Sequence, residues 1–204
     1  GIQGRTALYD LASDFAVSEI ICADIRFDEL SKIKDFTDME KITIAKIDAQ
    51  NKSELFDLYR KVDVVIDLLP KEFKSHVNEV ALEAKVPVVN TNYMYDTKNL
   101  DQKAKEAGIT IMPECGLDPG IDLVIYGDAR SRFDTLSTIN SYCGGFPEKK
   151  ACTNPLNYKL SWIWRGVLSS TLRDGRIIRE GQIIDIPGAI QHDESFVHEI
   201  NFPD

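Results

Sequence analysis

Two glycines and an aspartate near the start of the chain have the spacing of a dinucleotide-binding motif. Gly1 and Gly4 form a G-x-x-G pair, and Asp24 follows Gly4 by 20 residues, at the end of an apolar run. In such motifs the glycines let the backbone approach the pyrophosphate, and the acid binds the ribose hydroxyls. The glycine pair alone is also compatible with an ordinary helix start and a solvated acid. Together with the acid, it predicts a nicotinamide dinucleotide site.

The same aspartate bears on which cofactor is bound. A carboxylate accepts hydrogen bonds from both ribose hydroxyls of NAD and repels the additional phosphate of NADP. Arg26 follows two residues later and could pair with that phosphate. The sequence therefore favours NAD and leaves NADP possible. Further candidate cofactor contacts lie at the ends of later apolar runs: Asp48, Leu69, Pro70 and Asn90. For Asp48 and Asn90 the alternative role is that of a helix cap.

Short apolar runs alternate with helical patterns through the first 112 residues. This rhythm indicates βαβ units and an α/β fold, a Rossmann-type doubly wound parallel sheet whose first strand is apparently missing. The carboxyl ends of parallel strands share one edge of the sheet, where ligands bind. The predicted strands are 19–24, 42–48, 62–69, 86–90 and 109–112, and the predicted helices are 5–14, 53–60, 74–85 and 97–107.

The rhythm changes after residue 113. A loop rich in turn residues, 115–120, precedes a predicted helix over 121–132 and a predicted strand over 136–143. Another helix near 165–173 and two short strands around Glu180 and Gly181 follow. We therefore expect a cofactor domain over 1–117, incomplete at its N-terminus, and part of an α+β substrate domain over 118–204. The chain has no initiator Met and no closing element, so we expect a fragment.

Composition excludes several classes of protein. The chain has 24 Lys and Arg against 33 Asp and Glu, a net charge of −9, which disfavours a nucleic acid or an anionic membrane as partner. No apolar run approaches the roughly 18–20 residues of a membrane span, and no leader pattern is present. The four cysteines lack the spacing of a metal site or a disulfide framework. We expect reduced thiols, no metal and a cytoplasmic location.

Four segments resemble the saccharopine dehydrogenase (glutamate-forming), or saccharopine reductase, family. They match its G-L-D-P-G-I-D, S-Y-C-G-G-x-P, N-P-L-x-Y-K-x-S-W…R-G-V-L and T-S-Y patterns, although Asn92 replaces the usual serine. The resemblance runs from Gly1 to about residue 187, and the four segments are 113–122, 141–147, 154–168 and 91–93.

The resemblance implies hydride transfer between a nicotinamide cofactor and the C–N bond of an imine or secondary amine, in lysine metabolism. It makes Asp118 and Cys143 catalytic groups beside the reacting carbon, and Tyr93 and Arg165 substrate contacts. An acid suits the proton on nitrogen, and an arginine fork suits a substrate carboxylate. The alternatives are a turn-forming role for Asp118, a core thiol for Cys143 and a helix-surface role for Arg165.

Three other interpretations stay open. Lysine 6-dehydrogenases and carboxynorspermidine dehydrogenases resemble the same chain, although Asp118 and Leu117 favour the saccharopine branch. A silent NAD-binding sensor or subunit is the alternative from another class. For the enzyme we expect a small amino-acid substrate and a homodimer.

Overall fold

The computed structural model describes residues 1–26, 31–35, 37–93, 98–141, 143, 147–155, 159–160, 164–170 and 172–188. The chain divides into two compact units, Gly1–Gly145 and Phe146–Asp204. The sequence predicts a different division, a cofactor domain over 1–117 and part of a substrate domain over 118–204, and that division stays a prediction.

The strands of the first unit pair in parallel, which confirms the predicted α/β class. Each described strand lies inside a range that the sequence predicts. They form two sheets with the orders β1-β2 and β3-β4-β5, and every pair is parallel. The strands are β1 (Ile20–Asp24), β2 (Ile42–Lys46), β3 (Val65–Asp67), β4 (Val88–Asn90) and β5 (Ile111–Met112).

Helices follow the strands at the predicted places. The first one begins earlier than predicted, because Gly1 is its N-cap residue and the Gly1 carbonyl accepts a hydrogen bond from the Arg5 N–H at 3.2 Å. Gly4 therefore lies in the first helical turn rather than in a loop. The elements are α1 (Ile2–Ser13), α3 (Lys52–Tyr59), α4 (Lys74–Ala84) and α5 (Lys98–Ala107), with short 3-10 turns η1 (Ser31–Asp35) and η2 (Lys71–Phe73).

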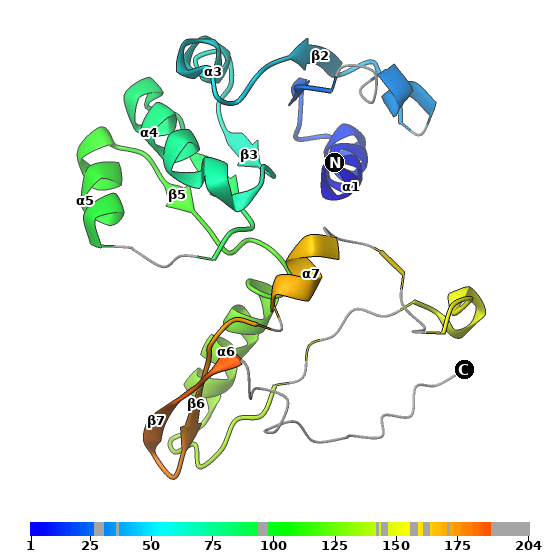
Figure 1. Ribbon diagram of the computed structural model, residues 1–204. Coiled ribbons are helices and arrows are strands. Elements are labelled where there is room, and N and C mark those ends of the chain that lie inside the picture. Colours follow the sequence, from blue (N-terminus) through cyan, green and yellow to red (C-terminus); the bar gives the residue numbers. More distant parts are fainter. Residues whose placement is uncertain are drawn as a thin grey trace. The chain divides into compact units, whose positions relative to one another are not determined.

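The main core of the first unit lies between α3, α4 and the sheet around β4 (Figure 1). Val77, Val80 and Ala81 recur at helical spacing on α4, and all three are buried with Val88 of β4. Burying one such valine stabilises a fold by about 1.5–3 kcal/mol. This core fixes β3 and β4 against the helices, and so fixes the polar residues that end these strands.

After β5 the first unit continues with a tight loop, a helix and a segment without regular secondary structure over residues 133–141 and 143. Helix α6 (Ile121–Arg132) has the predicted bounds. The predicted strand over 136–143 is wrong, because residues 136–141 and 143 are described and none of them lies in a strand. Alternating apolar residues make a strand only where a neighbouring strand completes the hydrogen bonds, and the described sheets offer none here.

The second unit contains the predicted hairpin. Strands β6 (Gly175–Arg179) and β7 (Gln182–Ile186) are antiparallel and join through Glu180 and Gly181, which both have positive φ, as a two-residue hairpin turn requires. Arg176 Nε lies 2.6 Å from Asp185 Oδ1 across the pair. The unit also holds η3 (Lys149–Ala151) and α7 (Trp164–Ser170). Among the described residues, every helix is too short or too polar to cross a membrane.

Candidate functional site

The start of α1 and the end of β1 lie together. The Gly1 nitrogen is 3.6 Å from Asp24 Oδ2. A dinucleotide site needs this arrangement, because the pyrophosphate rests on the helix N-terminus while the strand-end acid reaches the ribose. Within the part of the chain that the structure describes, no heavy atom lies within 4 Å of a Cβ built on Gly1 or Gly4, apart from chain neighbours and the backbone of the same helix. The open space at these glycines is compatible with a bound dinucleotide, and the contacts of Gly1, Gly4 and Asp24 with a cofactor stay predictions.

A cation lies beside this acid. The Arg26 N–H donates to Asp24 Oδ1 at 2.9 Å, and Arg26 Nε is 3.7 Å from the same oxygen. The guanidinium is mostly exposed, whereas the Asp24 side chain is 24 % exposed. An arginine in this position can balance the charge of Asp24 and meet a ribose phosphate.

The other candidate cofactor residues lie at strand ends, where their side chains shape turns. Asp48 Oδ1 accepts the Gln50 N–H at 2.9 Å, just before α3, and Asn90 Oδ1 accepts the Asn92 N–H at 3.0 Å. Pro70 precedes η2 directly, and Leu69 comes just before it. Their cofactor contacts stay predictions, and the turns give Asp48 and Asn90 a structural role as well.

Asp67 is a strand-end residue that the sequence reasoning missed. Its side chain is 4 % exposed, and Oδ1 accepts the Leu69 N–H at 2.9 Å. It lies opposite Asn90 in the parallel register of β3 and β4. Asp67 Oδ2 and Asn90 Nδ2 are both buried with no hydrogen-bond partner in the described part of the chain. Burial raises the pKa of the Asp67 carboxyl. An acid inside an apolar strand was the available signal.

Three residues that the sequence assigns to the reaction come together around Asp118. Tyr93 Oη donates to Asp118 Oδ1 at 3.5 Å, and the Cys143 thiol is hydrogen-bonded to the Asp118 carboxylate. Loss of solvent contact raises the pKa of Cys143, and the charges of Asp118 and Asp122 raise the pKa further. Cys143 is nevertheless exposed, so it is not a core thiol. The structure thus places a phenol and a thiol as donors to one carboxylate.

A self-bonded loop presents Asp118. The Gly116 N–H donates to the Pro119 carbonyl at 3.0 Å, and the Ile121 N–H donates to the Gly116 carbonyl at 3.0 Å. Gly120 has φ +151°, and a Cβ there would lie 2.1 Å from the Gly116 carbonyl oxygen. Only glycine fits, since a side chain would collide with backbone. The turn-rich segment therefore forms one rigid support for Asp118.

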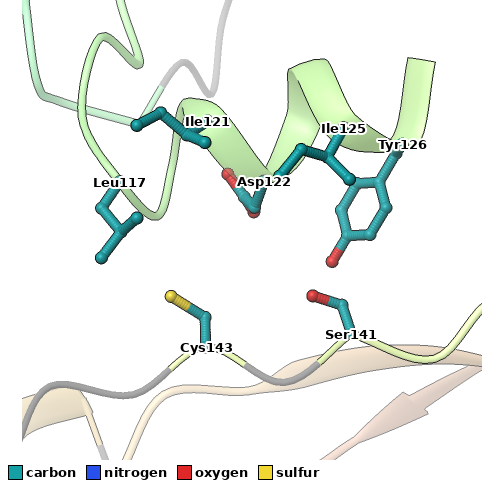
Figure 2. Close-up of a pocket in the computed structure, with 7 residues that line it drawn as sticks. All are labelled: Leu117, Ile121, Asp122, Ile125, Tyr126, Ser141 and Cys143. Atoms are coloured by element: carbon teal, nitrogen blue, oxygen red, sulfur yellow. The ribbon is translucent and has the colours of Figure 1, made fainter. Parts of the chain in front are cut away.

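A pocket opens between α6 and the segment that ends at Cys143 (Figure 2). It encloses about 410 Å³, part of which is open to solvent. One wall is apolar and the other side chains carry oxygen or sulfur. The lining residues are Leu117, Ile121, Ile125, Asp122, Tyr126, Ser141 and Cys143.

Arg165, the predicted carboxylate anchor, belongs to the second unit. It lies on α7 with an exposed side chain. Tyr93, Asp118 and Cys143 belong to the first unit, so the structure brings these three together, and contact of Arg165 with their site stays a prediction. Parts of the matched segment before α7 lie outside the described residues, namely 156–158 and 161–163.

Two models of the same protein family match the chain in succession. Residues 1–112 match the saccharopine dehydrogenase NADP binding domain, and residues 116–204 match the saccharopine dehydrogenase C-terminal domain. The first of these domains is named for NADP binding, which supports a nicotinamide cofactor and favours NADP. The sequence reasoning favours NAD instead. Arg26 beside Asp24 is a physical reason for this difference.

Similar proteins carry related names. An Arabidopsis thaliana alpha-aminoadipic semialdehyde synthase is 34 % identical over 82 % of this chain and 16 % of its own length. A Pyricularia oryzae saccharopine dehydrogenase [NADP(+), L-glutamate-forming] is 36 % identical over 72 % of this chain and 34 % of its own length. A solved saccharopine dehydrogenase (L-Glu forming) from Saccharomyces cerevisiae superposes with a TM-score of 0.75 at 28 % identity, covering 98 % of this chain.

The match covers nearly all of this chain and only part of each relative. The chain spans 45 % of the yeast structure and 34 % or less of the two curated relatives above. Both successive family models, the sequence identities and the fold agree with the resemblance that the motifs carry. The chain therefore belongs to the saccharopine dehydrogenase family.

Proposed function

We propose that the protein catalyses hydride transfer between a nicotinamide cofactor and the C–N bond of an amino-acid-derived secondary amine. In the saccharopine direction, saccharopine, oxidised cofactor and water give glutamate, aminoadipate semialdehyde, reduced cofactor and a proton. The observation that carries this proposal is the meeting of Tyr93, Asp118 and Cys143 in a chain of this family. A silent cofactor-binding subunit would not need these three side chains together.

We assign the cofactor to the edge of the sheet where α1 begins and β1 ends. Gly1 and Gly4 admit the pyrophosphate, Asp24 binds the ribose, and Arg26 binds the phosphate of NADP. Asp48, Leu69, Pro70 and Asn90 are further contacts of the same proposal. NADP is the favoured cofactor and NAD is allowed. When bound, the cofactor supplies the hydride acceptor or donor, which no side chain can replace.

In the proposed reaction Asp118 holds or releases the proton of the substrate nitrogen, directly or through one water. Cys143 lines the same site as a thiol donor to Asp118. Tyr93 and Arg165 bind the substrate, and the arginine fork pairs with one of its carboxylates. With the exception of Tyr93, these roles place the cofactor residues in 1–117 and the reaction and substrate residues in 118–204. The adjoining ranges of the two family models support that division.

We further propose a cytoplasmic homodimer with a small amino-acid substrate. The cysteines support a reducing compartment, because all four are free thiols. The net charge of −9 supports a substrate other than nucleic acid.

Turnover by the full-length protein tests the proposed function. Purified protein is given NADP or NAD with saccharopine, lysine or carboxynorspermidine, and reduced cofactor is followed by absorbance. We expect reduction with saccharopine, faster with NADP, and formation of glutamate. Turnover of lysine or carboxynorspermidine alone would move the protein to the corresponding relative. Cofactor binding without turnover of any substrate would favour the silent subunit.

A further inference from the structure

Asp122 is bonded to the loop that carries Asp118 through both its side chain and its backbone. Asp122 Oδ1 accepts the Gly120 N–H at 2.7 Å, and the Asp122 N–H donates to the Leu117 carbonyl at 3.2 Å. One bond reaches Leu117, just before Asp118 and Pro119, and the other reaches Gly120, just after them. The Asp122 carboxylate thus closes the loop at the position where Gly120 adopts its φ of +151°.

The same carboxylate faces the pocket. Figure 2 shows the Asp122 side chain on the first turn of α6, directed toward the side where Cys143 lies. The other polar groups around the thiol are Asp118 from the loop, Tyr126 from α6 and Ser141 from the segment that follows α6. The described residues that line the pocket include no Lys, Arg or His. Among the described residues of the first unit, the charges that act on the thiol are those of the Asp118 and Asp122 carboxylates.

We propose that Asp122 is a positioning residue of this site: its carboxylate ties the loop that holds Asp118 and places a second negative charge beside the Cys143 sulfur. The assignment of a reaction to the site rests on the proposed function, whereas the geometry does not. A thiolate between two carboxylates is disfavoured, so Cys143 stays a thiol and donates its hydrogen to Asp118. A thiol in this state does not add to an electrophilic imine carbon, since the thiolate is the nucleophile.

Two substitutions at Asp122 separate the charge from the loop bond. Asp122→Asn keeps an oxygen that can accept from Gly120 and removes the charge, and Asp122→Ser does the same with a hydroxyl. Asp122→Ala removes both. Asp128→Asn is the matched control, because Asp128 is also on α6 and pairs with Arg132 at 2.8 Å, outside the pocket lining.

The readouts are the melting temperature of the full-length protein and the alkylation rate of Cys143 by iodoacetamide across pH, followed on its peptide by mass spectrometry. We expect Asp122→Asn and Asp122→Ser to lower the alkylation midpoint by about half a pH unit or more with the melting temperature retained. Asp122→Ala should lower both the alkylation midpoint and the melting temperature. Asp128→Asn should leave the midpoint unchanged and lower the stability only by the small contribution of one surface ion pair.

An alkylation midpoint in the Asn and Ser variants equal to that of the parent would overturn the proposal. An unaltered melting temperature in Asp122→Ala would overturn its loop part. Neither readout needs turnover, so the result is independent of the proposed function. A shifted alkylation midpoint in a protein that turns over no substrate would retain this inference and reject the proposed function. An unshifted midpoint in a protein that turns over saccharopine would reject this inference alone.

Discussion

The Asp118 carboxylate accepts hydrogen bonds from Tyr93 and Cys143, each 25 residues away in sequence. Neither bond comes from the turn in which Asp118 lies. A residue that only formed a turn would use its carboxylate on its own backbone, as Asp24, Asp48 and Asp67 partly do. At the scale of single residues, Asp118 is thus the position whose side chain contacts the two other candidate site residues, Tyr93 and Cys143.

Asp118→Asn tests the proton role. The amide keeps the shape and an acceptor for Tyr93 but cannot take up a proton, so turnover should fall by roughly 10²–10⁴ while the melting temperature holds. Cys143→Ser is the comparison, since a hydroxyl also donates to Asp118, and turnover should stay within about tenfold of the parent. Steady-state rates across pH check both. Retention of a third of the activity in Asp118→Asn, or a larger loss in Cys143→Ser, would reassign the proton.

Arg26→Ala tests the cofactor preference. Loss of a charged hydrogen bond to phosphate costs about 1.5–3 kcal/mol, which is tenfold or more in the Kd for NADP. The Kd for NAD should change little, because NAD lacks that phosphate. Cofactor titration by fluorescence measures both, with Arg132→Ala on α6 as the remote control. An equal change in the Kd for NAD and for NADP would show that Arg26 does not bind the additional phosphate of NADP.

At the scale of elements, Gly120→Ala tests the loop between β5 and α6. The new Cβ would lie 2.1 Å from the Gly116 carbonyl oxygen, so the loop must open, and Asp118 must move. We expect a lower melting temperature and at least a hundredfold loss of turnover, the scale of losing a general acid. Gly127→Ala is the control, since no described side chain or remote backbone atom lies within 4 Å of its Cβ position and helical alanine is about 1 kcal/mol better than glycine. A stable, active Gly120→Ala variant would contradict this role of the loop.

The buried Asp67 at the end of β3 should make the stability of the fold depend on pH. Burial raises the pKa of Asp67, so the folded state holds this proton more tightly than the unfolded chain. The stability it contributes is complete below the ordinary pKa of about 3.9 and is lost as pH rises through the raised value. Asp67→Asn should therefore be more stable than the parent at neutral pH, by about 1–3 kcal/mol, and the difference should vanish in acid.

Urea unfolding at acidic and neutral pH measures that difference. Asp57→Asn on α3 is the matched control, because Asp57 is exposed and should show no pH-dependent gain. A gain of Asp67→Asn that is the same at both pH values would mean that ionisation of Asp67 does not affect folding.

The elements themselves were largely predictable. All five parallel strands lie within predicted ranges, because short apolar runs between helices are typical of buried parallel strands. The strand over 136–143 was predicted wrongly from the same apolar signal, since pairing depends on distant residues that local sequence does not reveal. Asp122 and Asp67 were missed for a similar reason: Cys143 lies near Asp122, and Asn90 lies opposite Asp67, only in the folded chain.

At the scale of the molecule, the two parallel sheets of the first unit correspond to parts of one known topology. A doubly wound sheet has the strand order 3-2-1-4-5-6. Taking away strand 1 leaves 3-2 and 4-5-6, and these are the orders of β2-β1 and β3-β4-β5. The G-x-x-G pair, normally placed between strand 1 and its helix, accordingly appears here at the start of α1. The fold and the family model therefore agree on a Rossmann-type cofactor domain, and its binding edge stays a prediction.

The second unit should contribute the substrate anchor, so cofactor and substrate binding should be separable. Arg165→Lys keeps a positive charge but loses the planar fork that pairs with a carboxylate through two bonds. We expect the KM for the amino-acid substrate to rise about tenfold or more, because one bidentate pair is worth at least 1.4 kcal/mol, with the Kd of the cofactor unchanged. Arg176→Ala is the control in the same unit, since Arg176 pairs with Asp185 on the β6–β7 hairpin and should leave KM unaltered. If Arg165→Lys kept KM within about twofold of the parent, Arg165 would hold a structural place on α7 and another cation would bind the substrate.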